Sequence, residues 1–434
     1  MLTGARRTAA VLAAALAGAW LPLVQAPAHA DEVRDRQRPM LNALGMDAAW
    51  KITRGRGVTV AVVDSGVDPG QPDIAGSVTT GPNMLAAIDA GSKPARLHGT
   101  GMASLIAGHG HGPGRRAGVI GLAPEARILA IRVIAEKEDA GFVRFRTDER
   151  AEDAVARGIR YAADRGVDVI NLSLGKDDEI AAEREAIGYA IGKGAVVVAA
   201  VGNDGDKQRL LDGDGFAPYS YPASYPGVIA VAATVPSHTR APFSNRNFSV
   251  LLSAPGAGLP VAGPGGDYFL SSGTSDSSAL VSGIAALIRA KHPKLPPALV
   301  SQALVAGTRF GPGGKYDPEI GFGEVNAERA LTAAEELTSA PSGEAAGKPA
   351  RQRFGKDDPG PVTIIDRPAW VRPLIVAILF IGVVGTVAAS AISIAFARRH
   401  PRAAVAGGPP FPFRAGPPPG RPGAPGQFGQ FGQP

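Results

Sequence analysis

Short apolar runs alternate with segments of helical periodicity between residue 57 and about residue 306. The continuous runs are typical of strands buried on both faces, and they predict strands at residues 57–63, 128–133, 167–172, 195–201 and 228–232. The periodic segments predict helices at residues 99–107, 150–164, 180–191, 275–291 and 297–306. This alternation indicates an α/β fold with a mainly parallel central sheet and helices on both of its faces.

A different apolar segment stands at the N-terminus, where Arg6 and Arg7 precede an Ala- and Leu-rich stretch at residues 8–23. The small-x-small sequence that ends at Ala30 follows it, so we expect residues 1–30 to be a signal peptide. The arginine pair also raises twin-arginine export, although the bulky residues usual after such a pair are missing. An uncleaved anchor is the alternative, and the cleavage site argues against it.

The second long apolar run covers residues 374–397 and contains no charged residue. As a helix it would reach roughly 36 Å, which is enough to cross a bilayer with some tilt. Trp370 stands before this run and Arg398 and Arg399 follow it, as is typical of the two membrane interfaces. We therefore expect a transmembrane helix, with a cleaved signal leaving the large domain outside the cytoplasm and the C-terminal tail inside. A buried core helix is the alternative.

These segments divide the chain. Residues 31–56 are expected to form an N-terminal extension to a domain at residues 57–337, and residues 338–366, rich in Gly, Pro, Ser and charges, a flexible linker. Residues 398–434 are Gly/Pro-rich and predict a disordered cytoplasmic tail. Such a composition fits either a ligand of a proline-binding partner or a solvated tail without a specific partner.

Composition excludes several classes of function. The chain has 434 residues and no cysteine, which rules out disulfides, thiol chemistry and cysteine-bound metals. The formal charge is +6, but the basic residues are scattered, so we expect no nucleic-acid partner. His109 and His111 have no carboxylate close in sequence and are interpreted as surface residues, and Asp204 with Asp206 as a polar loop. No metal and no organic cofactor is expected.

Three residues in glycine-flanked settings carry the candidate chemistry. Asp64 follows the first predicted strand, His98 opens a predicted helix, and Ser275 ends a small turn before another helix. Asp, His, Ser is one of the chain orders in which a catalytic triad occurs. A serine hydroxyl needs a base to become nucleophilic, which His98 would supply while Asp64 orients the imidazole. Each residue alone is also explained as a turn or helix cap.

A fourth residue, Asn203, ends another apolar strand, at the carboxyl edge where ligands of parallel sheets bind. Its side-chain amide would donate to the oxyanion of a tetrahedral intermediate, beside the backbone N–H of Ser275. Because Gly-Asn is also a common turn, Asn203 by itself fits either role.

Together these motifs resemble the subtilisin-like serine proteases, the peptidase S8 family. The matching stretches are AVVDSGVD around Asp64, HGTGMASLIAG around His98, NLSLG at residues 171–175, AAVGNDG around Asn203, and SGTS ending at Ser275. The resemblance covers about residues 57–283. It implies a subtilisin-like three-layer domain and a serine endopeptidase acting on protein or peptide substrates. It further implies that two segments pair with an extended substrate and line the pocket for the residue before the scissile bond. These segments are Ser173, Leu174, Gly175 and Ala200, Val201, Gly202.

The flanking segments resemble those of the mycosins, membrane-anchored subtilases of type VII secretion systems. Like theirs, the extension at residues 31–56 is too short for a folded inhibitory propeptide. This resemblance implies an extracytoplasmic catalytic domain on a single-pass anchor, association with a type VII secretion membrane complex, and processing of secreted substrates. The alternatives are a protease-like scaffold subunit with weak or no turnover, and a general surface protease.

The chain departs from the family pattern directly after Ser275. The family has an apolar residue, two small residues and a proline there, whereas this chain has Asp276-Ser277-Ser278-Ala279. Loss of the proline is expected to relax the start of the helix. We hypothesise that Asp276 raises the pKa of His98 and favours a basic residue just after the scissile bond. The alternative is that Asp276 is only a carboxylate favoured by the helix dipole. No calcium-binding loop is recognised, and the cysteines common in mycosins are missing.

Overall fold

The computed structural model describes residues 32–89, 91–313, 315–339 and 371–399. They fall into two units, an α/β unit that ends with helix α11 (Ala327–Ser339) and a separate helix, α12 (Val371–Arg399). The predicted signal peptide lies outside the described residues, as do all but the first two residues of the predicted linker and of the predicted tail. Those first residues belong to α11, a helix that the sequence pattern did not predict, and to α12, which runs slightly further than predicted.

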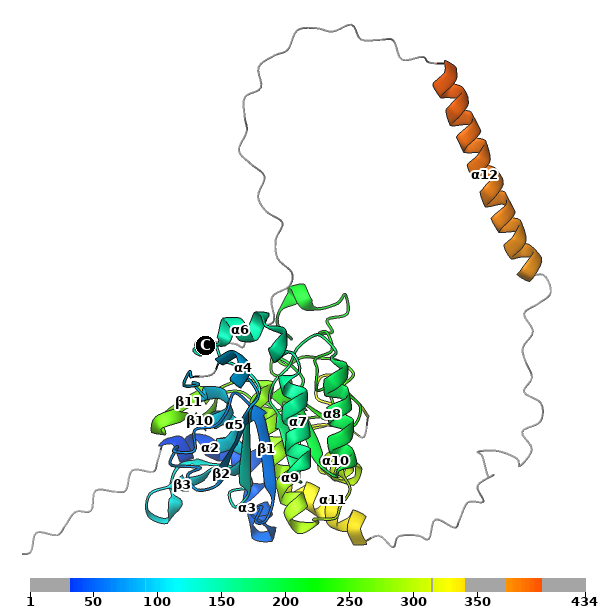
Figure 1. Ribbon diagram of the computed structural model, residues 1–434. Coiled ribbons are helices and arrows are strands. Elements are labelled where there is room, and N and C mark those ends of the chain that lie inside the picture. The colour runs from blue at the N-terminus through cyan, green and yellow to red at the C-terminus, as the bar shows by residue number, and fades with distance from the viewer. Residues whose placement is uncertain (1–31, 90, 314, 340–370, 400–434) are drawn as a thin grey trace, which may run out of the picture. The chain divides into compact units, whose positions relative to one another are not determined.

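A seven-stranded sheet forms the centre of the α/β unit, with the strand order β2-β5-β1-β6-β7-β8-β9 and parallel pairing throughout. This confirms the predicted fold class (Figure 1). The edge strands β2 and β9 were not predicted, because VTTGPN and LSAP contain no continuous apolar run. In sheet order the strands are β2 (Val78–Asn83), β5 (Arg127–Arg132), β1 (Thr59–Asp64), β6 (Val169–Leu172), β7 (Val196–Ala200), β8 (Ile229–Thr234) and β9 (Leu252–Pro255).

Helices cover both faces of this sheet, which explains the continuous apolar runs. In β1, Val60 and Val62 belong to one hydrophobic cluster, whereas Ala61 and Val63 belong to the other. Helices α7 (Ala154–Asp164) and α8 (Ala181–Gly192) pack together over one face, in front of the sheet in Figure 1. The other face carries α5 (Leu97–Ala107) and α9 (Thr274–Lys291), with α10 (Pro297–Ala306) and α11 beyond them.

The predicted N-terminal extension is structured and packs on the α/β unit. It forms α2 (Glu32–Ala43) and α3 (Met46–Ile52). Gln37, which is fully buried, donates to the carbonyl of Ile120 (3.2 Å) and accepts from the Ile120 N–H (2.9 Å). The smaller elements are α4 (Ala86–Asp89), α6 (Phe142–Thr147), the hairpin strands β3 (His109–His111) with β4 (Ala117–Ile120) and β10 (Leu259–Ala262) with β11 (Tyr268–Ser271), and the 3-10 turns η2 (Pro113–Arg115), η3 (Glu149–Ala151), η4 (Gln208–Leu210) and η5 (Pro264–Gly266).

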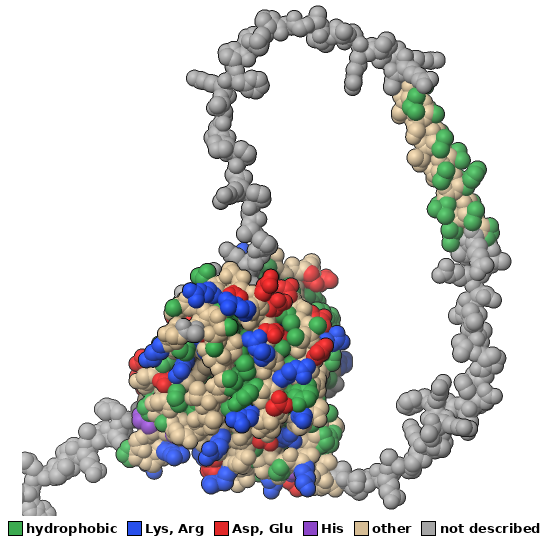
Figure 2. Space-filling view, in the orientation of Figure 1, with side chains coloured by type: hydrophobic (Ala, Val, Ile, Leu, Met, Phe, Trp, Pro, Cys, Tyr) green, Lys and Arg blue, Asp and Glu red, His purple; other side chains and the backbone are tan. Residues whose placement is uncertain are grey.

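Helix α12 contains a long apolar segment. Its segment Pro373–Ala395 is long and apolar enough to cross a membrane by length and composition, and none of it is buried in the structure. Figure 2 shows hydrophobic side chains along the visible side of this helix, whereas Lys, Arg, Asp and Glu are interspersed over the visible face of the α/β unit. The helix coincides with the transmembrane segment expected at residues 374–397.

Candidate active site

The predicted site residue Asp64 is the last residue of β1, at the carboxyl edge of the parallel sheet. It is fully buried, and its Oδ1 accepts the backbone N–H of Ser65 (2.7 Å). A buried carboxylate requires hydrogen-bond donors, and the second donor is His98. Nδ1 of His98 lies 2.8 Å from Oδ1 and 3.0 Å from Oδ2 of Asp64.

His98 is held against β1 by the way α5 begins. Gly99 donates its N–H to the hydroxyl of Ser65 (3.0 Å), the residue after Asp64. A Cβ on Gly99 would lie 2.1 Å from the carbonyl oxygen of Gly66, a distance that no side chain tolerates. The glycine after His98 therefore permits the first turn of α5 to approach the end of β1, and this approach brings the imidazole to Asp64.

Glu136, which the sequence analysis did not single out, also holds this helix. Its carboxylate accepts the N–H groups of Leu97 (2.9 Å) and His98 (2.5 Å), which have no acceptor within their own helix. Burial raises the pKa of Glu136, and the hydrogen bonds from His98, Leu97 and Ser65 offset part of that rise. No local sequence pattern identifies Glu136 as a cap of α5. Its carboxylate lies at the start of the helix in space, but the residue follows the helix in the chain.

The electrostatics of the site favour a protonated His98. Burial lowers the pKa of His98, but the carboxylates of Asp64, Glu136 and Asp276 outweigh burial and raise it to about 9. Asp64 contributes both its charge and its hydrogen bond. The ring therefore keeps its proton up to a pH well above the usual pKa of a histidine, and general-base chemistry requires that proton to be lost.

Ser275 is the second residue of α9 and is almost fully buried, with 5% of its surface exposed. Its hydroxyl donates to the carbonyl oxygen of Ser173 (3.2 Å). Helix α9 packs against α5, and Asp276, the next residue along, contributes to the electrostatics of His98. The structure therefore brings the predicted Asp64, His98 and Ser275 to one edge of the sheet from β1, α5 and α9.

Asn203 follows β7, and Thr274 fixes the orientation of its amide. The N–H and the hydroxyl of Thr274 both donate to Oδ1 of Asn203, each at 2.9 Å. The hydroxyl of Thr274 in turn accepts the N–H of Gly202 (3.2 Å). The amide nitrogen of Asn203 therefore points away from Thr274, and it has no hydrogen-bond partner among the residues that the structure describes. A Cβ placed on Gly273 would lie 3.4 Å from it.

A buried polar network of Asn171, Ser173, Ser278 and Ser282 holds the backbone of Ser275 in place. The side chain of Asn171 donates to the hydroxyl of Ser173 (2.9 Å) and accepts from Ser282 (2.9 Å). Ser173 donates to the carbonyl oxygen of Ser275 (2.9 Å), and its hydroxyl lies 2.8 Å from that of Ser278. Helix α9 is continuous from Thr274 onward, so these bonds tie its first turns to β6 where the family pattern would have a proline.

The two predicted wall segments differ in exposure. Ser173 and Leu174 are buried and Gly175 is exposed, directly after β6. Ala200 is the last residue of β7 and pairs with β8, and Val201 is also buried. Gly202 has a φ of 104°, and a Cβ there would meet the side chain of Asn245 at 2.5 Å, so this turn requires glycine. Both segments reach the carboxyl edge of the sheet, where Ser275 lies.

Asp276 is fully buried beside Ser275. Its Oδ2 accepts the hydroxyl of Ser271 (2.8 Å), while its Oδ1 has no hydrogen-bond partner among the described residues. Burial raises the pKa of Asp276 to about 7, against the lowering effects of Ser271 and His98. The charge of Asp276 raises the pKa of His98, in the direction hypothesised from the sequence, while the hypothesised preference for a basic residue stays a prediction.

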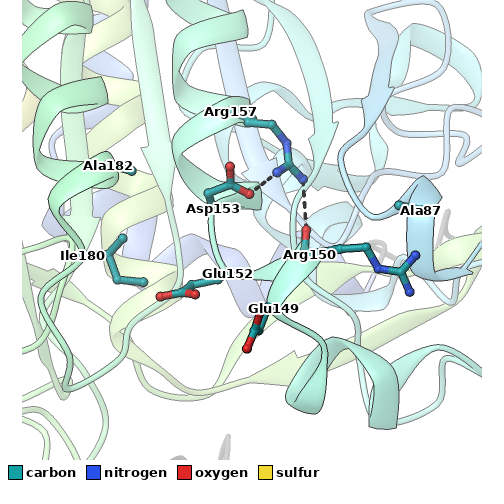
Figure 3. Close-up of a pocket in the computed structure, with 8 residues that line it drawn as sticks. All are labelled: Ala87, Glu149, Arg150, Glu152, Asp153, Arg157, Ile180 and Ala182. Carbon is teal, nitrogen blue, oxygen red and sulfur yellow. Dashed lines mark hydrogen bonds and ion pairs between the residues drawn. The ribbon is translucent and has the colours of Figure 1, made fainter.

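In the part of the chain that the structure describes, the other polar clusters are held in local ion pairs and hydrogen bonds. His111 contacts Asp73 through Nδ1 (2.6 Å), a carboxylate distant in sequence, and Asp204 pairs with Lys207. No group of three possible metal ligands occurs among the described residues. A groove at the start of α7 and α8 is lined mainly by charged side chains, with Asp153 and Arg157 ion-paired across one helical turn (Figure 3). None of the predicted site residues lines this groove.

Comparisons with known proteins agree with this site. Residues 55–323 match the model of the subtilase family, peptidase S8. Thermitase from Thermoactinomyces vulgaris is 37% identical over 242 residues, which cover 55% of this chain and 77% of thermitase. MycP1 with its N-terminal propeptide removed aligns with a TM-score of 0.57 at 29% identity, over 68% of this chain and 96% of that one. Another MycP1 structure, of a serine protease described as an essential component of the type VII (ESX-1) secretion system, has a TM-score of 0.56 at 31% identity, over 68% and 88% of the two chains.

The chain therefore belongs to the subtilase family, and it is a serine endopeptidase. The predicted resemblance to subtilisin-like proteases is confirmed, and mycosins are among its structural neighbours.

Proposed function

We propose that this chain is a membrane-anchored serine endopeptidase in which Asp64, His98 and Ser275 form the catalytic triad and Asn203 stabilises the oxyanion. The hydrogen bond of 2.8 Å between the fully buried Asp64 and Nδ1 of His98 is the observation that carries this proposal. A proton on Nδ1 satisfies the carboxylate and makes Nε2 the nitrogen that accepts a proton during the reaction.

Ser275 is the nucleophile. Its Oγ attacks the carbonyl carbon of the scissile peptide bond while its proton passes to Nε2 of His98. In this structure the hydroxyl donates to the carbonyl oxygen of Ser173, so its hydrogen has to rotate about the Cβ–Oγ bond toward His98 for the reaction. The imidazolium then gives the proton to the leaving amine, and a water molecule hydrolyses the acyl-enzyme by the same proton transfers.

Asn203 stabilises the negative oxygen that forms when Ser275 attacks. Thr274 occupies the amide oxygen of Asn203 with two hydrogen bonds, which presents the amide nitrogen as the donor. The backbone N–H of Ser275 supplies a second donor, because the first N–H groups of α9 have no acceptor inside the helix. An extended substrate pairs with Ser173 to Gly175 and with Ala200 to Gly202, the two segments that leave the sheet beside Ser275.

A fluorophosphonate probe tests this proposal, because it labels only a serine that a neighbouring base activates. We expect the full-length protein in detergent to be labelled, and Ser275→Ala and His98→Ala to abolish labelling. Asn203→Leu should keep labelling measurable but lower kcat for a peptide ester by about 100-fold or more. Labelling that survives Ser275→Ala, or a folded wild-type protein that is not labelled, would contradict the proposed triad.

Helix α12 serves as the membrane anchor in this proposal, with the protease domain outside the cytoplasm. Its apolar segment Pro373–Ala395 supports this role. We expect the protein to stay in the membrane fraction after alkaline carbonate washing, and a variant that ends before residue 371 to be released. Protection of the protease domain from external trypsin in intact cells would contradict the proposed orientation.

The structural neighbours support a role in type VII secretion, with processing of secreted proteins as the activity and the secretion membrane complex as the partner. The second candidate is a scaffold subunit, favoured by the hydroxyl of Ser275, which donates to Ser173 in this structure. Complementation of a deletion strain separates the two. Loss of substrate processing with Ser275→Ala, at normal protein levels, supports catalysis. Full rescue of both secretion and processing by Ser275→Ala supports the scaffold.

A further inference from the structure

The groove between the starts of α7 and α8 has no part in the triad (Figure 3). Its volume is about 620 Å³, which is within the usual range of ligand-binding clefts. Ala87, Ile180 and Ala182 give it apolar surface, and five charged side chains of residues 149–157 line the rest. This α7–α8 groove is therefore a cleft of binding size with a mixed apolar and charged lining.

The two arginines of the α7–α8 groove are engaged by groups of the protein itself. Arg150 is ion-paired with Asp148 through both Nε (2.9 Å) and Nη2 (2.6 Å). Arg157 is ion-paired with Asp153, and it also donates to the carbonyl oxygen of Met84 (2.8 Å). Both positive charges of the groove are therefore already paired.

The carboxylates of Glu149 and Glu152 are not paired in this way. Both residues are exposed, and neither side chain has a hydrogen bond or an ion pair among the residues that the structure describes. In Figure 3 the carboxylate of Glu152 lies on the side of Ile180, whereas the guanidinium of Arg150 points away from it, toward Ala87. The groove therefore presents two unpaired negative charges beside apolar surface, which fits the apolar stem and the cationic end of a lysine or arginine side chain.

Glu183, the residue after the groove-lining Ala182, is a third carboxylate with unused bonding capacity. It is fully buried in the first turn of α8. One of its oxygens accepts from Nζ of Lys176 (2.5 Å), and the other has no hydrogen-bond partner among the described residues. A buried acceptor without a donor is costly, and the charged ends of lysine and arginine carry only donors. The start of α8 thus lacks donors, as do the two glutamates of the groove.

The α7–α8 groove lies near the edge of the sheet that carries the triad. Helix α7 connects β5 to β6 and α8 connects β6 to β7, and each returns the chain to the opposite edge before the next parallel strand, so both helices begin near the carboxyl edge. Ser173 contacts the hydroxyl of Ser275 through its carbonyl oxygen. Ile180 follows Gly175 by five positions, and five residues span at most about 18 Å. A substrate that pairs with Ser173 to Gly175 therefore has its more distant upstream residues within reach of the groove.

Resting on the proposed function, we propose that the α7–α8 groove binds a lysine or arginine side chain of the substrate, roughly three to six positions before the scissile bond. The cation pairs with Glu149 and Glu152, while its stem packs on Ile180 and Ala182. The two glutamates determine specificity and take no part in bond cleavage. This preference differs from the one hypothesised for Asp276, which concerns the residue after the scissile bond.

The test is cleavage of a peptide mixture by the full-length protein in detergent, with mass spectrometry to identify the residues on both sides of each cut. We expect Lys and Arg to be enriched over Asp and Glu at one of the upstream positions named above. Two synthetic peptides that differ only there, with Lys or Ala, should show kcat/KM about tenfold higher for Lys. High salt should reduce this ratio, because the pairing charges are exposed.

Substitutions of the two glutamates test whether the groove is responsible. Glu149→Gln combined with Glu152→Gln should abolish the difference between the Lys and Ala peptides, and Glu152→Lys should make a peptide with Glu at that position better than one with Lys. Glu328→Gln combined with Glu336→Gln is the matched control, since it removes two charges from exposed positions of α11 and should keep the wild-type ratio. Each readout is a ratio of two substrates within one protein, so a lower folded fraction does not alter it.

Cleavage that depends on Ser275 but shows no basic preference upstream of the cut would overturn the proposal. So would a wild-type ratio in the Glu149→Gln/Glu152→Gln variant, or an equal loss in the Glu328→Gln/Glu336→Gln control, because general charge would then be the cause. If the first double variant does not fold, Glu152→Lys alone decides. If cleavage does not depend on Ser275, the proposed function itself fails, and the role of the groove fails with it.

Discussion

Thr274 donates two hydrogen bonds, from its N–H and its hydroxyl, to the same amide oxygen of Asn203, each at 2.9 Å. The residue before the proposed nucleophile thereby orients the proposed oxyanion donor. A helix start and a strand end, 71 positions apart in the chain, are joined at the point where the reaction's negative charge would form.

This relationship predicts the effect of Thr274→Val. Valine has nearly the shape of threonine but lacks the hydroxyl, so one of the two bonds that orient Asn203 is lost. We expect kcat for a peptide substrate to fall about tenfold with little change in KM, because the loss concerns the transition state. Thr332→Val, at an exposed helical position, is the control and should leave both constants unchanged. A rise in KM with constant kcat would indicate a substrate-binding role instead.

The electrostatics of His98 predict an alkaline protease. The neutral fraction of the imidazole falls about tenfold for each pH unit below its pKa, so kcat/KM should follow it on the acid limb. We expect the midpoint of this limb at about 9 in the free enzyme. The pH profile of kcat/KM with an uncharged peptide measures it directly. A profile that is already flat at neutral pH would show that the carboxylates around His98 are screened.

Asp276 also predicts how stability depends on pH. Its pKa is raised by folding from 3.8 to about 7, so between these values the folded state holds a proton that the unfolded chain has released. Stability from this group is therefore complete below the unfolded pKa and is lost as pH rises through the folded pKa, by about 1.4 kcal/mol per pH unit within the window.

We expect Asp276→Asn, in an inactive Ser275→Ala background, to be less sensitive to pH between these values than Ser275→Ala alone. Urea unfolding at several pH values measures the two slopes. Parallel slopes would show that Asp276 stays ionised in the folded state or that water reaches it.

The buried polar network of Asn171, Ser173, Ser278 and Ser282 predicts that Asn171→Ala lowers the stability of the fold. This fully buried side chain bonds the hydroxyls of Ser173 and Ser282, and its removal leaves both with a lost partner in the core. We expect a loss of about 2–3 kcal/mol in the free energy of unfolding. Asn42→Ala, at an exposed position, should change it by less than about 0.5 kcal/mol. Equal urea midpoints for the two variants would mean that the network adds no stability.

Much of the fold could be predicted because local pattern and burial agree. The strands β1 and β7 are continuous apolar runs because both faces of the sheet are covered, and Val60 with Ala61 shows this alternation directly. Edge strand β2 and the hairpin of β10 and β11 escaped prediction. Their residues are partly exposed or lie in short Gly- and Pro-rich pieces, where sequence pattern and structure are only weakly coupled.

The sequence alone determined the chemistry available to the site. Glycine after His98, the turn before Ser275 and the apolar strands before Asp64 and Asn203 are local features, and each is readable because backbone sterics and burial act over a few residues. The long apolar run that forms α12 is equally local.

The tertiary structure alone decided how these groups act on one another. Glu136 holds the start of α5 from a segment that lies 38 residues away, Thr274 orients Asn203, and the charge of Asp276, on another helix, raises the pKa of His98. Hydrogen bonds and charge interactions of this kind depend on distance in space and on the exclusion of water. Neither quantity can be derived from the spacing of residues along a chain.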